Sequence, residues 1–174
     1  MLRGWWLVTL LLAALGLAMG GAHLLELPVR MQYDPALYMQ VTSTLYRYYG
    51  LVGGPIQVLA FLSAAVLAWM VRARSSFRST LVGTLCIALS LLLWFLLVQP
   101  VNTAWAEALR SSPADAVQAY AQLRSRWEYG HLAAFVVWVA GFILLLRGLL
   151  QEVAGADPRP NFALDRARRG IKYQ

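Results

Sequence analysis

Four uninterrupted apolar stretches constrain this chain more than any other feature of its sequence. They cover residues 4–27, 50–71, 81–98 and 129–150. A helix rises 1.5 Å per residue, so about 20 apolar residues cross a hydrocarbon core about 30 Å thick. The chain is 60% hydrophobic and 13% charged, which leaves too few polar side chains to cover a soluble core. The sequence therefore predicts an all-α integral membrane protein, folded as a four-helix up-and-down bundle.

The predicted domain organisation is one bundle over residues 1–150 and a basic tail over residues 151–174. The tail is rich in proline and arginine, and contact with anionic lipid is its expected role. The first stretch has an alternative interpretation as a cleaved signal peptide, because small residues follow an apolar region that begins after Arg3. Its apolar part is longer than the roughly 7 to 15 residues usual in such peptides, which favours a retained span.

The basic residues divide unequally between the two ends of the predicted bundle. At the end that holds the termini lie Arg3, Arg72, Arg74, Arg78, Arg147, Arg159, Arg166, Arg168, Arg169 and Lys172. At the other end lie Arg30, Arg47, Arg110, Arg124 and Arg126. Because cytoplasmic loops carry the excess of Lys and Arg, both termini are predicted to be cytoplasmic, in a bacterial inner (plasma) membrane. Topology thus accounts for the net charge of +7, and the expected partner is membrane lipid rather than nucleic acid.

The two outer loops contain recognisable signals. Ser112, Pro113 and Asp115 supply a cap, a first-turn proline and a first-turn acid, so a helix over residues 113–128 is predicted to run into the fourth span. In the first outer loop, Tyr46, Tyr48 and Tyr49 are interpreted as part of an interfacial aromatic belt. The single Cys86 excludes an internal disulfide and a thiolate metal cluster.

Polar residues are costly in a membrane span, and here they gather at the outer ends of the spans. They are His23 and Glu26 on the first helix, Asn102 and Trp105 after the third, and Arg124, Arg126, Trp127, Glu128 and His131 at the start of the fourth. The first and last helices of an up-and-down bundle are neighbours. The two imidazoles, the only ones in the chain, are therefore expected within about 10 Å of each other, with Glu26 and Trp127 on the same lining.

Two features of this cluster have more than one interpretation. Gly16 and Gly20 lie on the same helical face as His23, where they permit close helix contact or leave clearance for a flat cofactor or substrate. Glu26 needs a cation, such as Arg30, Arg126 or a metal ion. His131, taken as lying in the opening turns of its helix, is expected to be neutral because the helix dipole disfavours imidazolium there.

Short segments of this cluster resemble those of the anthrone oxygenase-like family, a group of small four-helix membrane proteins. The segments are GAHLLELP ending the first span, PVNTAW after the third and RSRWEYGH opening the fourth. The resemblance covers about residues 1–150. It implies oxidation of an anthrone to an anthraquinone by oxygen without a recognised cofactor, with His23, Asn102, Trp127 and His131 forming an outward-facing pocket.

Three functions stay open at this point. The first is an oxidoreductase for a lipophilic aromatic or quinone-like molecule, with His23, His131 and Glu26 as catalytic residues and Asn102, Trp105, Arg126 and Trp127 binding the substrate. The second is a haem, iron or copper protein whose metal is held by His23, Glu26 and His131, with Gly16 and Gly20 making room for the cofactor. The third is a non-catalytic accessory subunit or small transporter, in a homo-oligomer or larger membrane complex, whose polar cluster joins helix ends.

Overall fold

The computed structural model describes residues 1–156, and these residues contain helices and short connections but no strand. The helices are α1 (Leu2–Arg30), α2 (Pro35–Leu45), the π-helical turn η1 (Tyr49–Gly53), α3 (Gly54–Met70), α4 (Phe77–Leu97), α5 (Gln99–Ser111) and α6 (Pro113–Ala156). The all-α prediction is therefore confirmed for the described part of the chain. Most of the predicted basic tail lies outside the described residues.

Four helical stretches are long and apolar enough to cross a membrane, as predicted. They are Leu2–Arg30, Tyr49–Met70, Phe77–Ser111 and Pro113–Gly155. The helices extend beyond the predicted spans at several ends, because they continue through the polar residues that flank the apolar runs. In particular, α6 extends past the predicted domain boundary at residue 150 and ends at Ala156.

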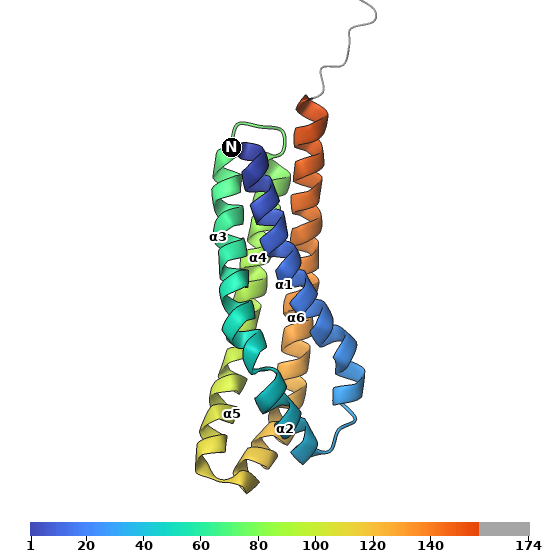
Figure 1. The fold of residues 1–174 in the computed structure, drawn as a ribbon, viewed down its shortest axis with the longest axis vertical. Helices are drawn as coiled ribbons and strands as arrows, with labels where there is room; N and C mark the ends of the chain where they lie inside the picture. The colour runs from blue at the N-terminus through green and yellow to red at the C-terminus, as the bar shows by residue number, and fades with distance from the viewer. Residues whose placement is uncertain (157–174) are drawn as a thin grey trace, which may run out of the picture.

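The long helices pack side by side in an arrangement compatible with a four-helix bundle. Helices α1 and α4 each pack against both α3 and α6. The start of α1, the α3–α4 connection and the end of α6 lie together at one end of the molecule (Figure 1). The other end, here called the α2–α5 end, holds α2, α5 and the first turns of α6.

Local sequence signals explain where the helices at the α2–α5 end begin. The Asp34 carboxylate accepts hydrogen bonds from the backbone N–H groups of Ala36 and Leu37 and so caps α2. The Ser112 hydroxyl accepts a bond from the Asp115 backbone at the start of α6, which confirms the predicted cap. Pro100 lies in the first turn of α5, where its missing N–H costs nothing, so α4 ends and a new helix begins. Helices α2 and α5 were not predicted.

Glycines bring the long helices into close contact. A Cβ atom on Gly83 of α4 would lie 2.9 Å from the Gly141 carbonyl oxygen on α6, and the converse distance is also 2.9 Å. Hydrogen bonds between side chains and backbone add to this contact: Ser90 donates to the Ala134 carbonyl at 2.7 Å. In an apolar environment small residues and such bonds hold helices together, because lipid gives no hydrophobic driving force.

Candidate functional site

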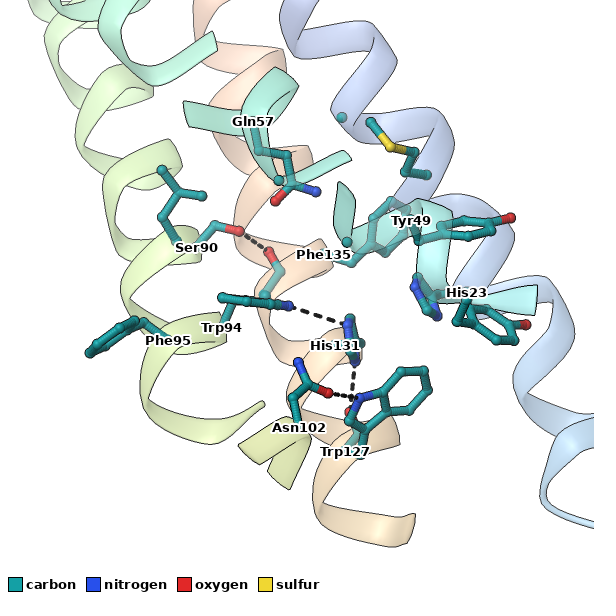
Figure 2. Close-up of a pocket in the computed structure, with 18 of the residues that line it drawn as sticks. His23, Tyr49, Gln57, Ser90, Trp94, Phe95, Asn102, Trp127, His131 and Phe135 are labelled. Atoms are coloured by element: carbon teal, nitrogen blue, oxygen red, sulfur yellow. Dashed lines mark hydrogen bonds between the residues drawn. The ribbon is translucent and has the colours of Figure 1, made fainter. Parts of the chain in front are cut away.

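A cavity of about 880 Å³ lies between the helices toward the α2–α5 end, and most of the predicted site residues line it (Figure 2). Those on its wall are Gly16, Gly20, His23, Asn102, Trp105, Trp127 and His131. The volume is within the range of about 300 to 1,000 Å³ typical of small-molecule sites. Sequence positions more than 100 residues apart thus converge on one mainly aromatic and aliphatic chamber, as His23 and His131 do.

The two histidines lie face to face inside the bundle. Their ring centroids are 4.4 Å apart and their planes differ by 21°, which confirms the expectation that the imidazoles lie within about 10 Å. His23 comes from α1 and His131 from α6, two helices in direct contact. Both rings belong to the cavity wall, and His23 is only 7% exposed.

Both ring nitrogens of His131 are engaged in hydrogen bonds. Nδ1 lies 2.9 Å from the Trp127 carbonyl oxygen, which can only accept, so Nδ1 carries the proton. Nε2 lies 3.3 Å from the indole N–H of Trp94, which can only donate, so Nε2 is the acceptor. His131 is therefore a neutral imidazole in one defined tautomer.

The reason given from the sequence for a neutral His131 was wrong. The helix dipole acts within about the first turn, and α6 begins at Pro113, many turns before His131. Two fixed hydrogen-bond partners, rather than the helix end, hold this ring neutral. Trp94, which supplies one of them, was not among the site residues predicted from the sequence.

His23 differs from His131 because its ring is not committed to protein partners. The residue is 7% exposed, and its Nδ1 is buried without a hydrogen-bond partner among the described residues. Aromatic rings surround it: Tyr46 at 4.9 Å, Tyr49 at 5.0 Å and Trp127 at 5.3 Å between centroids. A buried polar nitrogen without a partner is costly unless something else binds it. His23 is thus, with Thr42, one of the cavity-wall residues whose side chain has a buried polar atom without a partner among the described residues.

Tyr46 and Tyr49 were misassigned from the sequence. Tyr46 is buried, and both rings contact His23, whereas only Tyr48 of the trio is largely exposed. Their spacing of three residues puts both on one face where the chain passes from α2 into η1. The spacing of three residues could have indicated that Tyr46 and Tyr49 share one face, but both were interpreted as residues of a membrane belt.

Asn102 and Trp127 form a second fixed polar pair in the wall. The Trp127 indole N–H donates to Asn102 Oδ1 at 2.9 Å (Figure 2). This bond assigns the oxygen of the Asn102 amide and leaves its NH₂ group as a donor. Beside them, the rings of Trp105 and Tyr120 stack at 4.1 Å, and the Trp105 N–H donates to the Ala119 carbonyl.

Behind the cavity wall, Arg30 organises a buried charge network. Its Nε and Nη2 donate to the two carboxylate oxygens of Glu128 at 2.9 and 2.5 Å, with both side chains almost fully buried. Nη1 donates to Glu26 at 2.8 Å and to the Tyr46 hydroxyl. Nη2 also donates to the His23 carbonyl oxygen at 3.1 Å. The guanidinium therefore ties α1 to α6 directly behind His23.

Tyr38 of α2 completes this network from outside the long helices. Its hydroxyl donates to Glu128 at 3.0 Å, and its ring lies under the Arg124 guanidinium at 4.3 Å. Burial raises the pKa of Tyr38 well above its ordinary value, and the Glu128 carboxylate raises it further. The phenol therefore stays protonated and continues to donate to the carboxylate.

Two predicted site residues do not line the cavity. Glu26 pairs with Arg30, one of the cations anticipated for it, and its side chain is 40% exposed and is not part of the cavity wall. Arg126 is exposed and donates to the Leu96 carbonyl at 3.2 Å, which closes the end of α4. The expectation that Glu26 shares the lining was therefore wrong.

The residues do not fit a resident metal ion or haem. Within residues 1–156, no three His, Cys, Asp or Glu side chains are grouped as a metal site would need. A metal ion lies about 2 Å from a ligating nitrogen and in the plane of that ring. Two rings stacked face to face point their nitrogens side by side rather than toward one ion, and Trp94 already occupies Nε2 of His131.

Large aromatic rings cover the two glycines on α1. A Cβ atom on Gly16 would lie 2.4 Å from the Trp138 ring, and one on Gly20 would lie 2.5 Å from the Phe135 ring. The Trp138 indole N–H donates to the Ala13 carbonyl, which fixes its ring over Gly16. The glycines thus permit close contact between α1 and α6, and they also reach the cavity wall.

Comparison of the chain with models of protein families, with curated proteins and with solved structures finds no match.

Proposed function

We propose that this chain is an integral membrane protein with both termini in the cytoplasm and the α2–α5 end on the outer side. Four helices long and apolar enough to span a bilayer support insertion. Arg3, Arg72, Arg74 and Arg147 support the orientation, because they belong to the end opposite α2 and α5. A bacterial inner membrane is the proposed location.

The cavity is proposed to bind a flat, lipophilic aromatic molecule, of the phenolic or quinone-like kind, and to promote its oxidation. The observation that carries the proposal is the His23 imidazole in the wall of a chamber lined by aromatic rings, with an Nδ1 that has no hydrogen-bond partner among the described residues. Aromatic walls favour a planar ring system by stacking and edge contacts. A lone imidazole nitrogen favours a ligand that has a proton to give.

The chemistry proposed is that of the anthrone oxygenase-like family. His23 takes a proton from the CH₂ carbon between two aromatic rings, and the Asn102 NH₂ group stabilises the oxyanion that forms on the ring carbonyl. The carbanion gives its electrons to O₂, and the CH₂ group and O₂ become a C=O group and one molecule of water. Oxygen is the only oxidant required. His131, already neutral and hydrogen-bonded on both sides, supports the face of the His23 ring.

The test is oxygen uptake by purified protein in lipid nanodiscs supplied with anthrone, corrected for uptake with empty nanodiscs. His23→Gln should lower the corrected rate by about 10²-fold to 10⁴-fold, the usual contribution of a general base. Glu26→Gln, on the same helix but outside the cavity, should retain the rate. A His23→Gln protein that oxidises anthrone as fast as the unaltered protein would exclude this mechanism.

One observation favours a second candidate, a bundle without catalytic activity. Arg30, Glu128, Glu26 and Tyr38 satisfy one another's charges and hydrogen bonds, as a network that only joins helix ends would do. A protein that binds aromatic ligands but shows no oxygen uptake above background supports this candidate.

A further inference from the structure

The cavity wall and the outer surface of the bundle share residues. Val58 of α3, Leu92 and Phe95 of α4 and Leu109 of α5 line the cavity, yet they are 47%, 50%, 62% and 47% exposed, respectively. We call these four side chains the lateral rim. A residue can belong to both surfaces only where the cavity opens, so the chamber has a mouth between the η1–α3 side and the α4–α5 side.

The lateral rim is apolar and belongs to the part of the chain suited to the membrane. Val58 lies in the candidate span Tyr49–Met70, and Leu92 and Phe95 lie on α4 within Phe77–Ser111. Leu109 lies on α5, nearer the outer end of the bundle. In Figure 2, Phe95 projects from α4 at the side of the cavity, away from the histidines. On the outside of a membrane helix such side chains face hydrocarbon. The exposed charged residue of the cavity wall, Arg47, lies between α2 and η1, outside the candidate spans.

The helix contacts explain why a gap persists here. Helix α5 packs against α4 and α6, whereas η1 packs against α3 and α1. The two sides of the mouth therefore pack against different helices. Gly50 and Gly54, which also line the cavity, have no side chain with which to fill the gap.

We propose that the lateral rim is the entrance through which the ligand passes directly from the hydrocarbon of the bilayer into the cavity. This inference rests on the proposed function, since it concerns access to the same site. The ligand class that fits is a planar aromatic molecule that is dissolved in the membrane, because such a molecule meets the rim at its own depth. The hydrophobic cost of leaving the bilayer for water is avoided on this route.

The experiment measures ligand entry in nanodiscs by stopped-flow fluorescence. Trp94, Trp105, Trp127 and Trp138 line the cavity, so a membrane-soluble anthraquinone should quench protein fluorescence when it enters. Val58→Phe adds bulk at the rim and should slow both entry and exit several-fold while the dissociation constant changes little. Leu59→Phe, at the next position of α3, exposed but outside the cavity wall, should leave the rates unchanged.

A second pair of variants covers the case in which the first does not fold. Phe95→Ala widens the rim and should speed entry, whereas Leu96→Ala, its exposed neighbour outside the wall, should not. Normal quenching with unaltered rates in both Val58→Phe and Phe95→Ala would overturn the lateral entrance and leave the site intact. Absence of quenching in the unaltered protein would instead overturn the proposed binding site, and the entrance with it.

Discussion

At the residue scale, the buried ion pair of Arg30 and Glu128 holds the helix backbone that carries His23. Both side chains are at most 3% exposed, and the carboxylate accepts two bonds from the guanidinium and one from Tyr38. Burying such a pair costs desolvation free energy. Removing one partner destabilises the protein more, because the remaining buried charge then has no partner. Since Arg30 also donates to the His23 carbonyl, the network fixes the backbone that carries the proposed base.

Tyr38→Phe tests this network without removing a charge. It should destabilise the protein by about 1.5 to 3 kcal/mol, the usual contribution of a hydrogen bond to a charged group. In the folded protein the pKa of Tyr38 is raised, whereas in the unfolded chain the phenol ionises near pH 10. Tyr38 therefore contributes full stability below about pH 10, and this contribution falls as the pH rises above that value.

The measurement is thermal unfolding in detergent between pH 8 and 11, followed by tryptophan fluorescence. Tyr38→Phe should unfold at a lower temperature at pH 8 and should show a smaller further loss toward pH 11 than the unaltered protein. Tyr48→Phe, at an exposed tyrosine, is the control. Equal alkaline losses in the Tyr38→Phe and unaltered proteins would show that Tyr38 does not hold its proton as proposed.

At the scale of the elements, the crossing of α4 and α6 fixes the frame on which the cavity depends. Gly83 and Gly141 let the two backbones approach until each carbonyl oxygen lies 2.9 Å from where the other's Cβ would be. Because backbone atoms, unlike flexible side chains, cannot move aside locally, this crossing tolerates no side chain. The Trp94 and His131 positions, which belong to the same two helices, depend on this contact.

Gly83→Ala should therefore destabilise the protein by about 1 to 3 kcal/mol, the range for overpacking a close contact. Gly21→Ala is the matched control, because no heavy atom lies within 4 Å of where its Cβ would be. Alanine favours a helix over glycine by about 1 kcal/mol, so the control should be neutral or slightly stabilising. The measurement is the thermal unfolding temperature of both variants. Equal unfolding temperatures would show that α4 and α6 are not packed closely at Gly83.

At the scale of the whole molecule, the ion pairs lie at the two ends of the bundle, while the middle is mainly apolar. The α2–α5 end contains Arg30, Glu128, Asn102 and both histidines, and the opposite end has the Arg74 to Glu152 ion pair at 2.9 Å. This distribution suits a bilayer around the apolar middle. In the proposed orientation, the candidate site lies toward the outer end of the bundle.

Cysteine labelling tests the orientation. In a Cys86→Ala background, Asp34→Cys and Ser111→Cys should react from outside with a membrane-impermeant maleimide, because both positions are exposed at the α2–α5 end. Arg74→Cys, exposed in the α3–α4 connection, should react only after the membrane is opened. Labelling of Arg74→Cys in intact cells would invert the proposed topology.

The sequence by itself determined the four long apolar helices, the caps at Ser112 and Pro113, and the meeting of His23 with His131. These features follow from local composition and helical spacing, which act within a few turns of chain. Even the histidine pair needed only the rule that the first and last helices of a bundle are adjacent.

Only the tertiary structure decided which polar groups face the cavity. In the structure, Tyr46 and Trp94 line the cavity, whereas Glu26 and Arg126 do not. Glu128 is the buried partner of Arg30. The rotation of each helix about its axis and the docking of α2 set these outcomes, and both depend on packing between residues far apart in the chain. In a chain so uniformly apolar, the hydrophobic pattern around a helix carries little information about which face turns inward, because lipid and protein interior are equally apolar.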